Sequence, residues 1–283
     1  MASEPQKFKL AGIMGMPVLQ SRSPAIYNHW IREHGVLGAY GHLPVRIEQV
    51  ETALRGLAAL GMVGCNITLP HKLEALKIID SVHPMARQIG AVNCIVVQED
   101  GSLHGMNTDW VGYLGSIKEV QPGWRADQGP IAVLGSGGAA RAILYALVSE
   151  GAREIRLVNR TRAKADELAA DFPGIVQVHD WSQRHDVLAG CAMLINTTNQ
   201  GMYGQPPLDL QLAALPKEAL VSDLIYIPLE TPLLAAARER GNPTVNGLGM
   251  LLHQAVPAFE AYFGIRPQIT DALRRAVLAT FAT

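Results

Sequence analysis

The sequence is poor in the residues that build disulfide or metal-linked frameworks. Its 283 residues include three cysteines, Cys65, Cys94 and Cys191, an odd number at long spacings. Neither a disulfide framework nor a CxxC metal site fits that pattern, and the nine histidines form no HxxxH or HExxH motif. We therefore predict no metal, and we interpret the cysteines as buried, reduced thiols of a cytoplasmic protein.

The sequence also lacks an excess of charge and a long apolar run. The formal net charge is −1, and no basic block offers a surface that would neutralise phosphates. The most apolar runs are interrupted within about ten residues, too short to span a bilayer, and Met1–Lys9 lacks the apolar stretch of a signal peptide. We expect neither nucleic acid nor a membrane as a partner.

The chain is long enough and rich enough in apolar residues to bury a large core. Hydrophobic residues make up 48% of the chain and aromatic residues 6%, which suits helices packed closely on a sheet. A chain of this length is typical of about two domains. In the first half the pattern predicts strands over 9–14, 40–45, 64–68, 91–98 and 102–105. Helices are predicted over 23–34 and 47–60 and from Pro70 onward.

The pattern changes in the middle of the chain. Short apolar strands at 130–134, 154–158, 176–178, 193–196 and 220–223 alternate with helices such as 139–150 and 162–170. Strands that are apolar on both faces indicate a parallel sheet covered by helices. The tail, 247–283, is mostly helical, and its periodicity does not say where it packs.

A glycine-rich turn follows the first of these strands and opens a helix. It reads GxGxxA over Gly135–Ala140, in the sequence Gly135-Ser136-Gly137-Gly138-Ala139-Ala140. The first glycine permits a tight turn, the second lets the main chain approach a pyrophosphate, and the helix N-terminus offers free N–H groups. We predict a dinucleotide site here. A tight strand-to-helix turn that binds no ligand is the alternative, and the end of the next strand argues against it.

The end of the next strand indicates which dinucleotide binds. An NAD site usually carries a carboxylate at this position to bind the ribose 2′-hydroxyl. Here the residues are Asn159, Arg160 and Thr161, with Lys164 close by. An arginine can pair with a 2′-phosphate and stack on adenine, and a threonine can donate a hydroxyl hydrogen bond. The sequence therefore predicts NADP rather than NAD.

Four further segments are polar at the ends of predicted strands or the starts of helices, where an α/β sheet presents its ligand groups. They are Ser21–Pro24, Asn66–Lys72, Gly90–Asn93 and Asn107–Asp109. Each has an ordinary structural interpretation as a cap, a turn or a solvated lysine. Together, neutral hydroxyl and amide groups suit a polyhydroxylated substrate, and Lys72 with Asp109 can supply proton transfer.

These segments, in this order, resemble the shikimate dehydrogenase family over about residues 10–260. The motifs are Ser-x-Ser-Pro, Asn-x-Thr-x-Pro-His-Lys, Gly-Ala-Val-Asn and Asn-Thr-Asp, joined by the glycine turn and by Asn159-Arg160-Thr161. The resemblance implies an α/β substrate domain over 1–108, completed by 247–283, and a Rossmann-type NADP domain over 109–246. In this plan the C-terminal helices return to the first domain.

The resemblance also implies residue roles. Lys72 and Asp109 match the catalytic pair, in which hydride reaches the C3 ketone of 3-dehydroshikimate and Lys72 donates the proton. The groups that match substrate-binding positions are Ser21, Ser23, Asn66, Thr68, Asn93, Tyr226 and Gln254. Thr197, Gly247 and Met250 match cofactor-binding positions beyond the glycine turn. Shikimate and 3-dehydroshikimate are the expected small-molecule partners, and the assembly is expected to be a monomer or a homodimer.

Some positions depart from the family pattern. Met16, Gln20, Met106 and Asn199 replace residues that are usually Asn, His, small or polar, and Ser, respectively. They leave a quinate/shikimate dehydrogenase or a specialised paralogue as an alternative. A non-catalytic dinucleotide-binding protein is disfavoured by the intact Lys72 and Asp109, and a folate-linked dehydrogenase would leave the Ser-x-Ser and Gln254 segments unexplained.

Overall fold

The computed structural model describes residues 7–281, so most of the N-terminal stretch interpreted as lacking a signal peptide lies outside the described residues. The chain forms two compact units. Unit 1 comprises the residues up to Asp109 together with those from Leu252 onward, and unit 2 comprises Trp110–Leu251. Within 7–281, no helix combines the length and the apolar composition needed to cross a membrane.

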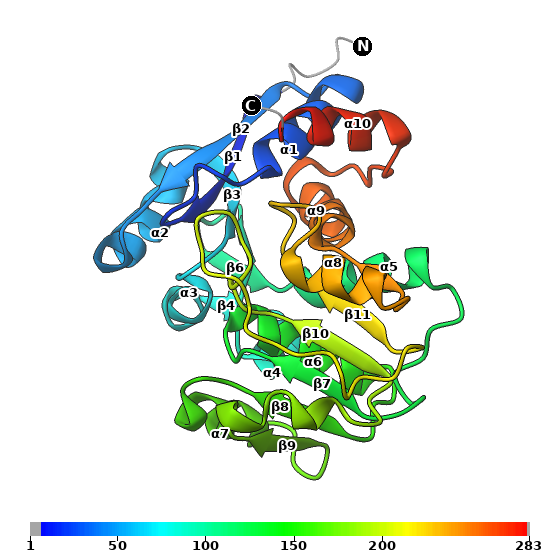
Figure 1. Ribbon diagram of the computed structural model, residues 1–283. Helices are drawn as coiled ribbons and strands as arrows, with labels where there is room; N and C mark the ends of the chain where they lie inside the picture. Colours follow the sequence, from blue (N-terminus) through cyan, green and yellow to red (C-terminus); the bar gives the residue numbers. More distant parts are fainter. Residues whose placement is uncertain (1–6, 282–283) are drawn as a thin grey trace. The chain divides into compact units, whose positions relative to one another are not determined.

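Unit 1 is built on a six-stranded sheet in the order β2-β1-β3-β5-β6-β4 (Figure 1). The strands are β1 (Lys9–Gly15), β2 (Gly38–Pro44), β3 (Met62–Ile67), β4 (Ser81–Val82), β5 (Cys94–Val97) and β6 (Leu103–Met106). β1 is parallel to both β2 and β3, whereas β5 is antiparallel to β3 and β6. The sheet is therefore mixed, and the strand pair predicted around residues 99–101 is the β5–β6 hairpin.

The helices of unit 1 come from both ends of the chain. They are α1 (Ser23–Glu33), α2 (Val50–Ala59), α3 (Lys72–Ile78), α4 (Pro84–Ile89), α9 (Gly247–Phe263, which begins in unit 2) and α10 (Asp271–Ala279). α3 begins at Lys72, two residues later than predicted, because residues 68–71 form a turn in which the His71 main-chain N–H donates to the Thr68 carbonyl oxygen at 3.0 Å. Lys72 thus stands in the first turn of the helix.

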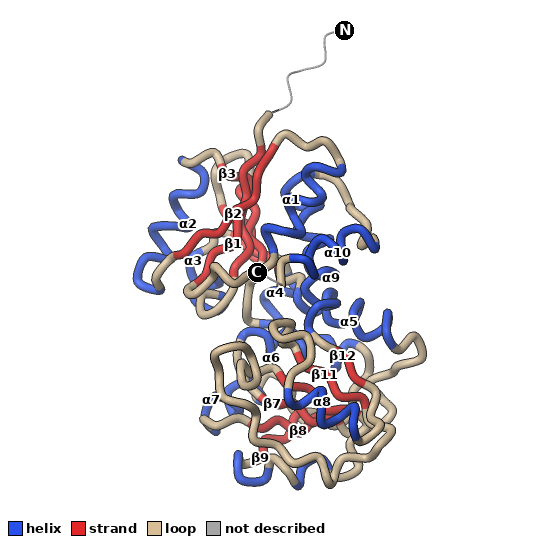
Figure 2. The backbone as a smooth tube through the Cα atoms, turned by 45° about the horizontal axis from the view of Figure 1, so that its top comes forward, coloured by secondary structure: helices blue, strands red, loops and turns tan. Residues whose placement is uncertain are grey.

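The C-terminal helices pack on the first part of the chain, as expected (Figure 2). The Trp30 indole nitrogen donates to the Gln268 carbonyl oxygen at 3.0 Å, and the rings of Trp30 and Phe259 meet edge to face with centroids 5.3 Å apart. A Cβ at Gly64 on β3 would lie 2.6 Å from Cε1 of Tyr262 on α9. The absence of a side chain there lets α9 lie close against the sheet.

Unit 2 has a second six-stranded sheet, in the order β12-β11-β10-β7-β8-β9, and every strand pair in it is parallel. The strands are β7 (Ile131–Leu134), β8 (Ile155–Val158), β9 (Val176–His179), β10 (Met193–Asn196), β11 (Leu220–Asp223) and β12 (Thr244–Val245). The helices are α5 (Asp109–Val120), α6 (Gly138–Ser149), α7 (Arg162–Ala169) and α8 (Pro232–Glu239).

The two faces of this sheet carry separate hydrophobic clusters. One is centred on Ile143, Leu147 and Ile155, and the other on Leu134, Leu194 and Leu234. All four residues of β7 are buried, as the continuous apolar pattern of that strand predicts for a parallel sheet covered on both faces. The prediction of an α/β fold with a Rossmann-type second domain is confirmed.

Candidate active site and dinucleotide site

A largely buried ion pair lies at the centre of the candidate site in unit 1. The Lys72 ammonium nitrogen lies 2.5 Å from Oδ2 of Asp109, and the two side chains are 15% and 6% exposed. Among the described residues, Asp109 is the one partner of Lys72 Nζ. An ammonium group has three N–H donors, so two remain for a ligand. This arrangement suits a group that donates a proton to a substrate oxygen.

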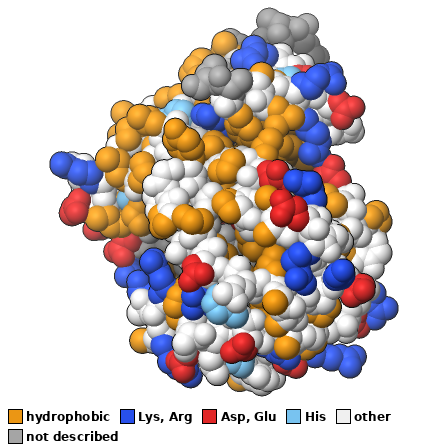
Figure 3. Space-filling view, in the orientation of Figure 1, with side chains coloured by type: hydrophobic (Ala, Val, Ile, Leu, Met, Phe, Trp, Pro, Cys, Tyr) orange, Lys and Arg blue, Asp and Glu red, His pale blue; other side chains and the backbone are white. Residues whose placement is uncertain are grey.

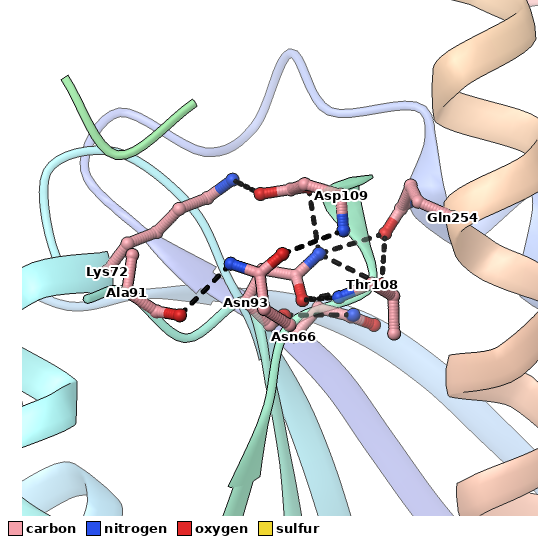
Figure 4. Close-up of polar contacts among 8 residues, drawn as sticks. Asn66, Lys72, Ala91, Asn93, Thr108, Asp109 and Gln254 are labelled. Carbon is pink, nitrogen blue, oxygen red and sulfur yellow. Dashed lines mark hydrogen bonds and ion pairs between the residues drawn. The ribbon is translucent and has the colours of Figure 1, made fainter. Parts of the chain in front are cut away.

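Asn93 holds the carboxylate of this pair. Its amide nitrogen donates to Oδ1 of Asp109 at 2.8 Å and to the Thr108 hydroxyl at 3.0 Å, while its amide oxygen accepts from the Thr108 main-chain N–H at 2.7 Å. Oε1 of Gln254 lies 3.3 Å from both the Asn93 amide nitrogen and the Thr108 hydroxyl. Figure 4 shows Lys72 reaching Asp109 from one side and Gln254 approaching from α9 on the other.

Asn66 extends the cluster along β3. Its amide nitrogen donates to the Asn93 carbonyl oxygen at 3.1 Å, and its amide oxygen accepts from the Tyr40 hydroxyl at 2.7 Å. The structure therefore brings together five of the predicted unit 1 residues, namely Asn66, Lys72, Asn93, Asp109 and Gln254.

The predicted serines form a separate pair at the start of α1. The Ser21 hydroxyl lies 3.2 Å from the Ser23 hydroxyl, and both residues are buried. Among residues 7–281, no hydrogen bond joins either serine to the Asn93 cluster. Thr68 is half-buried and is tied through its main-chain N–H to the Met14 carbonyl oxygen at 2.9 Å.

Two members of the cluster received no role from the sequence. Asn107 caps the start of α5, because its Oδ1 accepts from the Asp109 main-chain N–H at 3.0 Å while its amide nitrogen donates to the Ala91 carbonyl oxygen at 3.0 Å. Thr108 fixes the orientation of Asn93 through the bonds given above. Both lie in the Asn107-Thr108-Asp109 segment, so the motif itself was the signal.

The departures from the family pattern in unit 1 lie near the ends of strands. Met16 is 49% exposed in the loop after β1, where the exposed Gln20 amide donates to the Pro17 carbonyl oxygen. Met106 ends β6 opposite Cys94. Figure 3 shows hydrophobic side chains gathered over the β1–β3 part of unit 1. Separately, the loops that follow β1 and β3 expose Met16, Leu19 and Leu69.

In unit 2, the glycine turn has the geometry of a cradle for phosphate groups. Gly135 has φ +106°, and a Cβ there would lie 2.5 Å from the Thr197 hydroxyl. A side chain would therefore be both strained and obstructed. Gly137 precedes α6, and no side chain caps that helix, so its first N–H groups are available for an anion. Ser136, Gly138 and Ala139 complete the turn. These residues fit a dinucleotide pyrophosphate.

The end of β8 is exposed and basic. Asn159 closes the turn by donating to the Thr161 carbonyl oxygen at 2.8 Å. Arg160, Thr161 and Lys164 are all exposed. Within the described part of the chain, neither Arg160 nor Lys164 has an ion pair, and the Thr161 hydroxyl makes no capping bond to α7. These groups fit a 2′-phosphate, which needs cationic and hydroxyl donors.

A buried aspartate organises the loops that follow β10 and β11. The Asp223 carboxylate accepts from the Asn196 amide at 3.1 Å, from the Thr231 hydroxyl at 2.8 Å and from the Ile225 main-chain N–H at 3.1 Å. Burial raises the pKa of Asp223 to about 6, although these donors oppose that shift. The network shapes the loop that carries the half-buried Tyr226.

The last predicted cofactor residues stand at the start of α9. The Gly247 main-chain N–H donates to the Ile225 carbonyl oxygen at 2.9 Å, which places Gly247 beside the loop of Tyr226. The Met250 side chain is partly buried against the hydrophobic core of unit 2.

Thr197, the remaining predicted cofactor residue, follows β10. Its hydroxyl donates to the Leu134 carbonyl oxygen at 2.7 Å, next to the glycine turn.

Comparison with known proteins identifies the family to which this chain belongs. Three family models match the chain: the shikimate dehydrogenase substrate binding domain over residues 13–95, shikimate / quinate 5-dehydrogenase over 119–203, and the shikimate 5'-dehydrogenase C-terminal domain over 247–278. A shikimate dehydrogenase (NADP(+)) of Paramagnetospirillum magneticum is 52% identical over 273 residues, which cover 96% of this chain and 99% of that protein. The chain belongs to the shikimate dehydrogenase family.

Solved structures of family members share the fold. Shikimate dehydrogenase from Aquifex aeolicus has a TM-score of 0.86 at 36% identity, covering 95% of this chain and 97% of that one. Quinate dehydrogenase from Corynebacterium glutamicum in complex with NAD has a TM-score of 0.87 at 30% identity, covering 98% of this chain and 100% of that one. The resemblance stated from the motifs is thereby confirmed.

Proposed function

We propose that this chain catalyses the reversible, NADP-dependent reduction of 3-dehydroshikimate to shikimate, a step in the biosynthesis of aromatic amino-acid precursors. The observation that carries the proposal is the Lys72–Asp109 pair, joined at 2.5 Å and largely buried among amide and hydroxyl groups. The NADP-dependent relative that is 52% identical supports the choice of reaction.

Lys72 is the proposed general acid. Its ammonium group donates a proton to the C3 oxygen as the ketone becomes an alcohol, and the neutral amine takes that proton back in the oxidation direction. Asp109 holds Lys72 Nζ through Oδ2 while Asn93 holds Oδ1, so the lysine keeps one orientation through the cycle. NADPH, when bound, supplies the hydride.

The remaining polar groups of unit 1 are proposed to bind the acid. Amide and hydroxyl side chains can each donate to and accept from a ring hydroxyl or a carboxylate. We assign this role to Ser21, Ser23, Asn66, Thr68, Asn93 and Gln254, together with Tyr226 of unit 2. Accordingly, residues 1–108, completed by 247–283, form the proposed substrate domain.

The proposed NADP domain spans 109–246. The glycine turn holds the pyrophosphate, and the exposed Arg160 pairs with the 2′-phosphate. The proposed cofactor contacts are Gly135, Ser136, Gly137, Gly138, Ala139, Asn159, Arg160, Thr161, Lys164, Thr197, Gly247 and Met250. The last two belong to the start of α9, which follows the domain.

We further propose a cytoplasmic location and a monomeric or homodimeric state. Three free, buried cysteines support the location, because unpaired thiols are typical of a reducing compartment. Size-exclusion chromatography with light scattering will test the state, since a tetramer would contradict the proposal.

An absorbance assay at the reduced-nicotinamide band tests the reaction. Purified protein is given shikimate or quinate, each with NADP or with NAD. Fast reduction with shikimate and NADP is the expected result. Faster turnover of quinate would favour the second candidate, a quinate dehydrogenase, which the TM-score of 0.87 to such an enzyme supports. Absence of turnover with both acids would contradict the proposed function.

A further inference from the structure

The amide of Asn66 has one allowed orientation in unit 1. The Asn93 carbonyl oxygen can only accept, so the group 3.1 Å from it must be the Asn66 amide nitrogen. The amide oxygen then faces the Tyr40 hydroxyl at 2.7 Å, and that hydroxyl must donate. One N–H of Asn66 donates to the Asn93 carbonyl oxygen. Among residues 7–281 the second makes no hydrogen bond of ordinary geometry, and the buried Tyr27 hydroxyl lies near the same amide.

Tyr40 is itself held at three places. Asn28 on α1 accepts from the Tyr40 main-chain N–H at 3.0 Å and donates to its carbonyl oxygen at 2.8 Å. The ring stacks on that of Tyr27, with centroids 4.0 Å apart and planes 17° apart. The residue is 4% exposed. Main chain, ring and hydroxyl therefore have little freedom, and the hydroxyl is aimed at Asn66.

The donor role of this hydroxyl does not depend on the working pH. Burial raises the pKa of Tyr40 well above the ordinary range of a tyrosine, and neighbouring Tyr27, Cys65 and Cys94 act in the same direction. The phenol thus stays protonated in neutral and mildly alkaline solution. The amide oxygen of Asn66 keeps its donor throughout that range.

We propose that Tyr40 is a positioning residue for catalysis: its hydroxyl holds the Asn66 amide so that the second N–H faces a substrate hydroxyl. This inference rests on the proposed function, in which Asn66 binds the acid. With the Tyr40 hydroxyl removed, one end of the amide is unheld and can turn about the Cβ–Cγ bond. Binding and alignment of the acid then suffer, whereas the dinucleotide site, made by other residues, does not.

The first test is Tyr40→Phe, which keeps the stacked ring and deletes the hydroxyl. We expect kcat/KM for shikimate to fall about 5- to 150-fold, the range that corresponds to leaving one buried acceptor without its donor, with KM for NADP unchanged. Tyr262→Phe is the matched control. Its hydroxyl lies in the same buried aromatic cluster, where it accepts from the Cys94 thiol at 3.1 Å, and its loss should leave kcat/KM for shikimate unchanged.

A double variant separates positioning from a general structural effect. If Tyr40 acts through Asn66, then Tyr40→Phe made in an Asn66→Ala background should lower kcat/KM no further, within about twofold. Equal losses in both backgrounds, or equal losses in the Tyr40 and Tyr262 variants, would overturn the inference. The assay uses whichever acid, shikimate or quinate, the wild-type protein oxidises. Failure of the wild type on shikimate therefore counts against the proposed function, whereas the comparison of the single and double variants decides the role of Tyr40.

Discussion

Removing the charge of Lys72 should cost stability as well as activity. Lys72→Met keeps most of the aliphatic stem but leaves the Asp109 carboxylate, whose side chain is 6% exposed, without its cation. Breaking a fully buried pair costs about 3–5 kcal/mol. Asp109 keeps the 2.8 Å bond from Asn93 and water can enter where the partly exposed lysine stood, so we expect a loss of about 2–3 kcal/mol. Turnover should fall about 10²- to 10⁴-fold.

Adding Asp109→Asn to Lys72→Met separates the two losses. The double variant no longer buries an uncompensated charge, and the amide oxygen can still accept from Asn93. About half of the lost stability should therefore return while turnover stays low. Urea unfolding followed by circular dichroism measures the first quantity, and the absorbance assay measures the second.

Lys77→Met is the control on the same helix. Lys77 is 70% exposed and pairs with Glu74, so its replacement should change the unfolding free energy by less than about 0.5 kcal/mol and leave turnover as it was. A Lys72→Met protein as stable as the wild type, or a double variant no more stable than the single one, would refute the reasoning.

Three further predictions concern unit 2. Since burial raises the pKa of Asp223 to about 6, the folded protein binds that proton more tightly than the unfolded chain, and the contribution of Asp223 to stability falls as pH rises from about 4 through about 6. As pH rises over that range, the unfolding free energy of Asp223→Asn should increase relative to that of the wild type by on the order of 1–2 kcal/mol. A difference between the two proteins that does not change with pH would contradict this prediction. Arg160→Ala should raise KM for NADP about 10- to 100-fold and leave KM for NAD nearly unchanged; a parallel rise in both would mean that the 2′-phosphate is not its partner. Gly135→Ala should weaken NADP binding measured by calorimetry and lower the melting temperature, because the new Cβ would lie 2.5 Å from the Thr197 hydroxyl; Gly123→Ala, with open space around it, should change neither.

The sequence predicted the parallel sheet of unit 2 well because its strands carry their own signal. β7 is four apolar residues followed by a glycine turn, and the structure buries all four. The pattern was weaker in unit 1. The helix Pro84–Ile89 and the two-residue strand Ser81–Val82 were not predicted, because such short elements offer too few residues for a periodicity to show.

The candidate site was predicted as a set of residues but not as a connected network. The motifs identified Lys72, Asn93 and Asp109, yet no spacing rule says that Asn93 lies between Asp109 and Thr108. Tyr40 was outside every motif, since its proposed role comes from a contact between two strands, β2 and β3, that are separated by β1 in the sheet. Gln254 was placed by resemblance alone, because 161 positions separate it from Asn93.

That separation has a consequence for how the protein is made. Unit 2 is one continuous stretch of chain, Trp110–Leu251, and can complete its sheet before the residues that follow it are available. Unit 1 cannot do the same, because the Asn93–Gln254 and Trp30–Gln268 contacts need residues that follow unit 2 in the chain. The strands of unit 1 thus wait for helices that follow unit 2 in the chain, and the proposed substrate-binding groups come together only once those helices are available.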